Sequence, residues 1–206
     1  MSPSPRARPD PGRADQILDA AARTFARLGF GAARMDDVAS ESGLSKGALY
    51  LYFRSKDQLI EALVARIVAF ETRRLQAITN SGGSVAERLV RFGDEFAAEL
   101  VHLGPLAPMF LEAYARAMRH GTIRTAFQRY LASFRAELSA LIREGIQTGE
   151  LRTTDSDQAA LGIVGLMEGL ALLWTIDPAA APIVEASGAA LRLHLDGLRA
   201  PSVART

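Results

Sequence analysis

The chain has 206 residues, of which 49% are hydrophobic and 23% charged, a composition that predicts a globular protein with a packed core. Because it has no cysteine, disulfides and thiolate metal sites are excluded, and a reducing, cytoplasmic location is expected. The formal net charge of +1 gives no argument for nucleic-acid binding by the molecule as a whole.

Charge is distributed unevenly along the chain. Residues 1–56 carry nine Lys and Arg against six Asp and Glu, whereas residues 84–206 carry twelve against fourteen. This small basic excess is consistent with a nucleic-acid-binding domain at the N-terminus. Residues 1–12 are rich in proline and lack the apolar stretch of a signal peptide, so we expect a disordered arm there and a disordered tail at 201–206.

Apolar residues recur at helical spacing along almost the whole chain, and no segment alternates with a period of two. This pattern predicts an all-α fold of about nine helices. The first helix is expected to start at Asp10-Pro11 and to end at Gly29, a suitable C-cap. The loop at 80–84 separates the first four helices from the five that follow.

The second and third predicted helices form a helix-turn-helix. The second covers about 35–42, Gly43 supplies the backbone freedom for a sharp turn, and Ser45 is a good N-cap for a third helix of about seven residues. With Leu49 and Phe53 directed inward, the small or polar residues of this third helix are left outside, where side chains of such helices reach base edges in the major groove.

Residues 13–63 resemble the N-terminal domain of the TetR family of bacterial regulators. The resemblance lies in residues 29–30, 35–39, 43–53 and 55–59, with order and spacing intact. It implies a homodimer that reads a palindromic operator in double-stranded DNA, and a helical C-terminal domain that dimerises and binds a small effector. We therefore expect a helix-turn-helix DNA-binding domain at 13–58 and a larger effector-binding and dimerisation domain at 59–200.

The DNA-contact candidates combine the outward face of the third helix with positions that match the family motif. They are Arg34, Ser45, Lys46, Gly47, Ala48, Tyr50, Tyr52 and Lys56. The family usually places Thr or Ser before the second helix, but Ala33-Arg34 stand there, so the cap is missing while the guanidinium is able to hold a phosphate. Lys56 lies at a helix N-terminus, where a cation is unfavourable unless a phosphate binds beside it.

Plainer interpretations exist for several of these residues. Tyr50 and Tyr52 are alternatively half-buried core aromatics, and Lys46 and Lys56 are alternatively solvated charges. Residues 43–47 match the Gly-x-Ser-x-Gly pattern of a hydrolase, but that motif needs a preceding strand, and a helix is expected there. The three histidines have no recognisable catalytic or metal-ligand spacing, so we expect no enzymatic activity, no metal and no cofactor.

The larger domain offers candidates for two further sites. Aromatic residues and one carboxylate within an apolar helix form a possible effector pocket, although any one of them is alternatively plain core: Phe96, Phe110, Tyr114, Phe127, Tyr130, Phe134, Glu168 and Trp174. Small and apolar residues of the last two helices predict a dimer interface formed as a four-helix bundle: Leu161, Gly165, Gly169, Leu172, Leu191 and Leu195.

The apolar run at 159–176 has nearly the length of a membrane span. Because it is slightly short, carries Glu168 at its centre and is flanked by aspartates, a buried helix is the better interpretation, and no membrane association is expected.

The sequence thus predicts a cytoplasmic DNA-binding transcriptional regulator, in the family's commoner mode a repressor released from its operator by a small molecule. Two alternatives remain open. One is a helical small-molecule-binding protein or enzyme that shares the N-terminal domain, and the other is a DNA-binding regulator without a small-molecule effector.

Overall fold

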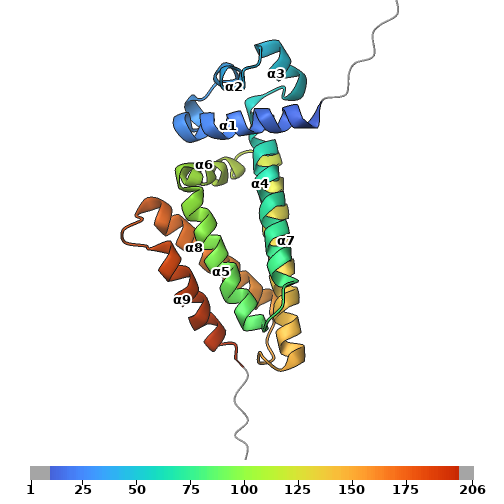
Figure 1. Ribbon diagram of the computed structural model, residues 1–206, viewed down its shortest axis with the longest axis vertical. Helices are drawn as coiled ribbons and strands as arrows, with labels where there is room; N and C mark the ends of the chain where they lie inside the picture. Colours follow the sequence, from blue (N-terminus) through green and yellow to red (C-terminus); the bar gives the residue numbers. More distant parts are fainter. Residues whose placement is uncertain (1–9, 200–206) are drawn as a thin grey trace, which may run out of the picture. The chain divides into compact units, whose positions relative to one another are not determined.

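The computed structural model describes residues 10–199, and the regular secondary structure of this range is helical, apart from one isolated bridge between Leu151 and Arg199 (Figure 1). Within this range the all-α prediction of about nine helices is confirmed. The elements are α1 (Pro11–Ala32), α2 (Met35–Glu41), α3 (Lys46–Tyr52), α4 (Lys56–Thr79), α5 (Val85–His102), the 3-10 turn η1 (Gly104–Leu106), α6 (Ala107–Ala117), α7 (Gly121–Thr148), α8 (Ser156–Ile176) and α9 (Ile183–Asp196).

The predicted disordered arm at 1–12 is wrong for its last residues. Asp10 is the N-cap of α1, and its carboxylate accepts the N–H of Gly12 at 3.0 Å. Pro11, whose missing N–H costs nothing at a helix start, follows it. The rest of the predicted arm, and the predicted tail at 201–206, lie outside the described residues.

The described chain forms two compact units. Residues 10–67 and 108–126 form the first, here called the head unit, and residues 68–107 and 127–199 form the second, the body unit. The sequence placed the domain boundary at 58/59 and assigned residues 108–126 to the body. In the structure α6 and the start of α7 instead belong to the head unit.

The core of the head unit forms where α2 packs against α1 and α3 packs against α2 (Figure 1). Phe25 and Phe30 of α1 are almost fully buried and meet edge to face, with ring centroids 4.9 Å apart. Between them Gly29 has φ 71° and ψ 163°, a kink that L side chains rarely adopt. This is the glycine that the sequence predicted as the helix end.

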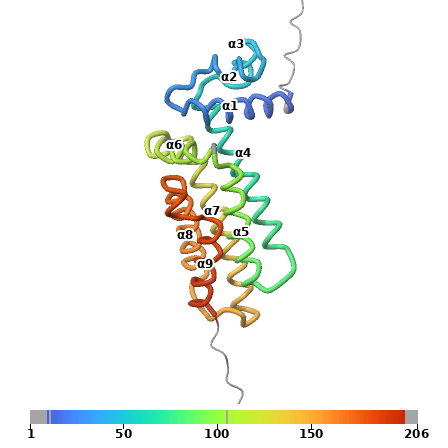
Figure 2. The backbone as a smooth tube through the Cα atoms, turned by 60° about the vertical axis from the view of Figure 1, so that its left-hand side comes forward, coloured from blue at the N-terminus to red at the C-terminus, as the bar shows by residue number. Residues whose placement is uncertain are grey.

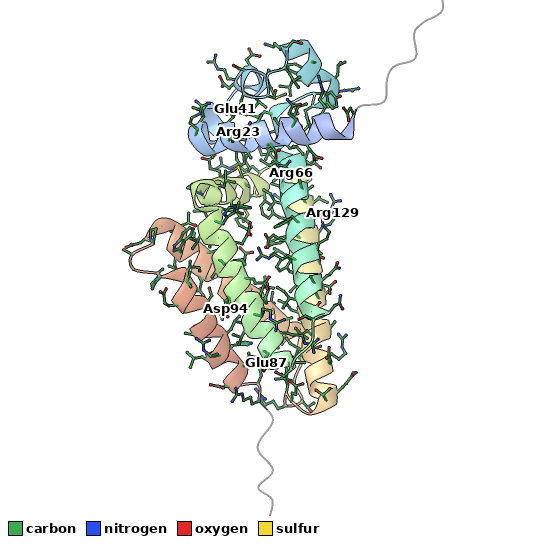
Figure 3. All side chains as sticks on the ribbon, in the orientation of Figure 1. Arg23, Glu41, Arg66, Glu87, Asp94 and Arg129 are labelled. Carbon is green, nitrogen blue, oxygen red and sulfur yellow. The ribbon has the colours of Figure 1, made fainter. Side chains whose placement is uncertain are left out.

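Two ion pairs at the surface of the head unit join its helices. Arg23 of α1 lies 2.7 Å from Glu41 of α2, and Figure 3 labels both side chains. Arg66 of α4 lies 2.8 Å from Asp19 of α1. Because these pairs are largely exposed, each contributes little to stability compared with the buried aromatic core.

The body unit is built around the packing of α9 against α5 and α8, and Figure 2 shows these three helices side by side. Two glycines allow the close approach of α5 and α9. A Cβ atom added to Gly93 of α5 would lie 2.2 Å from Leu191 Cδ1, and one added to Gly188 of α9 would lie 2.8 Å from Oδ1 of Asp94, a residue labelled in Figure 3.

The expectation of a buried helix at 159–176 is only partly met. The buried residues of α8 are Ala159, Ala160, Ile163, Val164 and Met167. The opposite face is exposed, and only 28% of the most apolar window lies inside the structure. By length and composition alone α8 is the one described helix able to cross a membrane. The sequence pattern did not separate the two faces, because both are apolar.

Candidate nucleic-acid interface

The turn between α2 and α3 has the geometry of a helix-turn-helix. Gly43 takes φ 68°, and the N–H of Leu44 returns to the carbonyl oxygen of Ala39 at 3.0 Å, which closes the end of α2. Ser45 then caps α3, since its hydroxyl accepts the N–H of Ala48 at 3.2 Å. The glycine and the cap were both predicted from the sequence. Together these two local features set the direction in which α3 leaves the turn.

One face of α3 is buried and the other is open. Leu49 is fully buried and Phe53, at the C-cap, is 8% exposed, as predicted. The exposed residues of α3 are Lys46, Gly47, Tyr50 and Leu51. Their spacings of three and four residues place them on one side of the helix. We call these four residues the reading face. Ala48 is partly exposed at its edge.

The two tyrosines of α3 have different surroundings. Tyr50 is 39% exposed on the reading face, which excludes a core role for it. Tyr52 is half-buried, and its hydroxyl oxygen accepts the backbone N–H of Asp10 at 3.3 Å. The phenolic proton of Tyr52 is still available to a phosphate oxygen, because that bond uses only an acceptor site.

Lys46 is held by a carboxylate of the preceding helix. Its Nζ lies 2.9 Å from Oδ1 of Asp36 in α2, and both side chains are exposed. The hydrogen bond and the negative charge of Asp36 raise the pKa of Lys46. The lysine therefore stays charged, but a phosphate or guanine must compete with Asp36 for it.

Lys56 has a structural function that the sequence did not reveal. Its ammonium donates to the carbonyl oxygens of Phe30, Gly31 (3.1 Å) and Ala33 (3.0 Å), which are the free acceptors at the end of α1. An ammonium has three N–H donors, so all are in use. The cation at the start of α4 is thus stabilised by the carbonyl end of another helix, and no phosphate is needed to explain it.

Arg34 lies at the N-cap of α2 with an exposed side chain, and it makes no side-chain cap. The carboxylate of Asp37 instead accepts the backbone N–H of Arg34 at 2.8 Å. This bond provides half of a capping box and compensates in part for the missing Thr or Ser.

The sequence pattern did not indicate that α6 belongs to the head unit. Glu112 Oε2 accepts the N–H of Phe30 at 2.6 Å, directly after the kink at Gly29. Arg116 lies 2.7 Å from Asp57 in the first turn of α4. A shallow hollow of about 350 Å³ lies here and is bordered by Phe30, Gly31, Glu112, Ala115, Arg116, Arg119 and His120. No local pattern predicts contacts between residues 59 to 82 positions apart.

The predicted effector-pocket residues are divided between the two units. Phe110 and Tyr114 lie in α6, in the head unit, whereas the others lie in the body unit. There Phe134 is buried with its ring centroid 4.6 Å from that of Tyr130, and Phe96 packs at the edge of the same core. Phe127 is also buried.

Glu168 has the polar partner that its position in an apolar helix requires. The hydroxyl of Tyr130 donates to its Oε1 at 3.4 Å, and Glu168 is half-buried. Trp174, on the same helix, lies beside Gly104. These residues place a hydrogen-bonding pair beside the aromatic part of the body core.

The predicted interface residues also divide into two groups. Leu191 and Leu195 are almost fully buried inside the chain, where they belong to the body core, so assigning them to an interface is wrong. Leu161 and Leu172 are 49% and 43% exposed, and nothing lies within 4 Å of a Cβ atom at Gly165 or Gly169. The exposed apolar face of α8 therefore comprises Leu161, Gly165, Gly169, Leu172, Leu173 and Ile176.

Comparison with protein families matches both parts of the chain. Residues 17–63 match the family described as bacterial regulatory proteins, tetR family. Residues 84–200 match the C-terminal domain described as that of a BetI-type transcriptional repressor.

Curated relatives cover most of the chain. An uncharacterized helix-turn-helix regulator, YfiR, of Bacillus subtilis is 30% identical over 74% of this chain and 74% of its own length. The nicotine-responsive repressor HdnoR of Paenarthrobacter nicotinovorans is 28% identical over 81% of this chain and 85% of its own.

Solved structures have the same fold. A TetR transcription regulator from Haloarcula marismortui has a TM-score of 0.83 at 18% identity and covers 91% of this chain and 98% of its own. The regulator FadR of Bacillus subtilis, solved with stearoyl-CoA, has a TM-score of 0.78 at 23% identity, with 90% and 99% covered.

Proposed function

Because this chain belongs to the TetR family and is a helix-turn-helix transcriptional regulator, we propose that it is a cytoplasmic homodimeric repressor that a small molecule releases from a palindromic operator. In this proposal each protomer inserts α3 into the major groove, and the two half-site centres lie roughly 34–36 Å apart or somewhat more on one face of the DNA. The protein acts by binding and not by catalysis.

The observation that carries this proposal is the reading face of α3. It combines a cation, a hydroxyl donor, a glycine and an exposed apolar side chain on a helix whose opposite side is buried. A Cβ atom at Gly47 would meet nothing within 4 Å, so the backbone is open to close approach there. Such a surface suits base edges and phosphates together.

The proposed dimer forms through the exposed apolar face of α8. An apolar strip of this kind is costly in water, and glycines four residues apart allow another helix to come close. Val184 and Leu193 of α9 are also exposed, at 54% and 74%. We assign this face to a second copy of the chain and not to a membrane, because the relatives are transcriptional regulators.

The proposed effector site lies among the aromatic residues of the body unit, beside the Tyr130–Glu168 hydrogen bond. Two similar proteins respond to or bind organic molecules, as a nicotine-responsive repressor and as a stearoyl-CoA complex. Phe96, Phe127, Tyr130, Phe134, Glu168 and Trp174 remain the candidate contacts. The other two candidates, Phe110 and Tyr114, belong to the head unit.

The test of DNA binding starts from a duplex selected by the purified protein out of a random-sequence library. We expect the selected sequence to be palindromic, and Tyr50→Ala to weaken binding to it about tenfold, the loss of about 1.4 kcal/mol that one good contact provides. Phe70→Ala removes an aromatic that is 49% exposed on α4 in the body unit and serves as the matched control. Equal affinities of Tyr50→Ala and the parent protein would contradict the proposed reading face.

The test of the dimer is sedimentation of Leu172→Glu, which should shift the protein to monomer. Val101→Glu, at a residue 48% exposed on α5, should leave the dimer intact. A monomeric parent protein, or a dimeric Leu172→Glu variant, would contradict the assignment of this face.

A further inference from the structure

We infer that Leu51 recognises the C5-methyl group of a thymine in each half-site, as a specificity-determining residue of α3. The inference rests on the proposed placement of α3 in the major groove. Leu51 lies within the helix-turn-helix motif, but the candidate DNA contacts derived from that motif do not include it.

The exposure of Leu51 requires an explanation. It is 79% exposed, while its neighbours Leu49 and Phe53 are buried. Within the described residues it is the most exposed of the large hydrophobic side chains. A leucine there contributes nothing to the core of the head unit, and its apolar surface is costly unless a partner covers it.

The position of Leu51 on the helix indicates that DNA is this partner. It follows Gly47 by four residues and Tyr50 by one, so it lies on the reading face one turn after Gly47. Side chains in a helix lean toward its N-terminus. The space left by the missing side chain of Gly47, which no atom occupies within 4 Å of a Cβ position, is therefore next to Leu51.

The chemistry of the groove selects the thymine methyl. It is the one methyl group that the four bases present in the major groove, where the other recognition features are hydrogen-bond donors and acceptors. The leucine side chain can make no hydrogen bond, and contact with that methyl group removes apolar surface of both from water, which favours binding. Contact with deoxyribose would also bury the leucine, but it would carry no information about sequence.

The experiment is a double-substitution cycle between protein and DNA. In the selected duplex each thymine of a half-site is replaced in turn by uracil, which lacks only the C5-methyl group. Affinities of the parent protein and of Leu51→Ala are then measured for each duplex at one salt concentration. Met118→Ala, which truncates a side chain 73% exposed outside α3, is the control.

We expect uracil at one position to weaken binding of the parent protein and of Met118→Ala roughly fourfold, the effect of one buried methyl group. The same replacement should change binding of Leu51→Ala less than twofold. Leu51→Met, which keeps an apolar side chain of similar volume, should retain most of the sensitivity and show that the alanine variant does not act through a damaged helix.

Three results would overturn the inference: a parent protein that tolerates uracil at every position, a Leu51→Ala variant as sensitive as the parent, or a selected half-site without thymine. In each of these cases, weaker DNA binding by Tyr50→Ala would still support the proposed insertion of α3 into the major groove. If Tyr50→Ala instead binds the duplex as tightly as the parent protein, that proposed function is contradicted as well.

Discussion

The ammonium group of Lys46 lies 2.9 Å from the carboxylate of Asp36, although the two residues are ten positions apart and lie on either side of the turn of the helix-turn-helix. In the free protein the cation of the reading face is therefore paired with an anion of the protein itself. Binding to a phosphate or to a guanine edge requires Lys46 to exchange one partner for another, and the Asp36 charge then faces the DNA.

This relationship predicts that Asp36→Asn strengthens DNA binding. We expect an increase of about threefold to fivefold in affinity at low salt, on the order of 1 kcal/mol for one removed negative charge, and a smaller increase at high salt because the interaction is screened. Fluorescence anisotropy with the selected duplex over a range of salt concentrations measures it. Glu185→Gln, an exposed carboxylate of α9 in the body unit, should leave affinity unchanged, and weaker binding by Asp36→Asn would refute the prediction.

Lys56→Met is predicted to reduce stability rather than DNA affinity. The substitution leaves three carbonyl oxygens at the end of α1 without their cation. We expect a loss of about 1–2 kcal/mol, which lowers the midpoint of thermal unfolding by a few degrees.

The affinity of the folded Lys56→Met protein for the selected duplex should change less than twofold. A variant of normal stability and strongly reduced affinity would show instead that the ammonium contacts phosphate in the complex.

Glu144→Gln is predicted to destabilise the protein in a pH-dependent way. Arg88 of α5 is 6% exposed and donates hydrogen bonds to the Glu144 carboxylate, and these bonds lower the pKa of Glu144 below its ordinary value of 4.5. A carboxyl group whose pKa is lower when folded contributes stability above the unfolded pKa, and this contribution is lost as pH falls through the folded value.

The expected loss for Glu144→Gln is about 1 kcal/mol at pH 7, since the glutamate is half-exposed and the pair is partly screened. The difference in unfolding midpoint between parent and variant should shrink as the pH falls below 4.5. Glu185→Gln serves again as a control, since Glu185 forms no ion pair among residues 10–199. A difference that stays constant from pH 7 to pH 3 would contradict the assignment.

Gly93→Ala is predicted to loosen the packing of α5 against α9. The new methyl group would lie 2.2 Å from Leu191 Cδ1, and Leu191 is fully buried, so that side chain or the helices must shift. Overpacking of this kind costs roughly 1–3 kcal/mol, which the better helix propensity of alanine offsets only in part. Thermal unfolding should show a midpoint lower by a few degrees.

Gly121→Ala is the matched substitution for Gly93→Ala, since a Cβ atom at Gly121 meets nothing within 4 Å. The midpoint of thermal unfolding of Gly121→Ala should be unchanged or slightly higher than that of the parent protein. A higher midpoint for Gly93→Ala would contradict the prediction, because it would mean that α5 and α9 accommodate the added methyl group without loss of stability.

Features governed by short-range chemistry could be predicted from the sequence. Gly29 and Gly43 adopt the positive φ angles that their predicted positions require, Ser45 caps α3, and Leu49 and Phe53 lie inward. Each of these depends on residues within a few positions, where turn and capping preferences are strong.

The rest depends on which distant segments meet. Lys56 had a recognisable position in the motif, yet its partners are carbonyl groups 23 to 26 residues earlier. Every residue has a backbone carbonyl group, so the sequence cannot indicate which of them accept a hydrogen bond from a distant side chain. Glu112 reaches Phe30 across 82 residues. In the last two helices, the residues facing the core and those facing outward are equally apolar, so the sequence could not separate Leu191 from Leu172.

The proposed dimer through the exposed apolar face of α8 would make DNA binding by this regulator depend on its own concentration. In the proposed dimer, association covers that face, so the apparent stability rises with protein concentration by mass action. When the protein concentration falls, the dimer dissociates, the leucines of the α8 face become exposed to water, and each released protomer carries only one α3. Occupancy of a two-part operator consequently falls more steeply than the total amount of protein, which gives the cell a threshold in the response before any effector has bound.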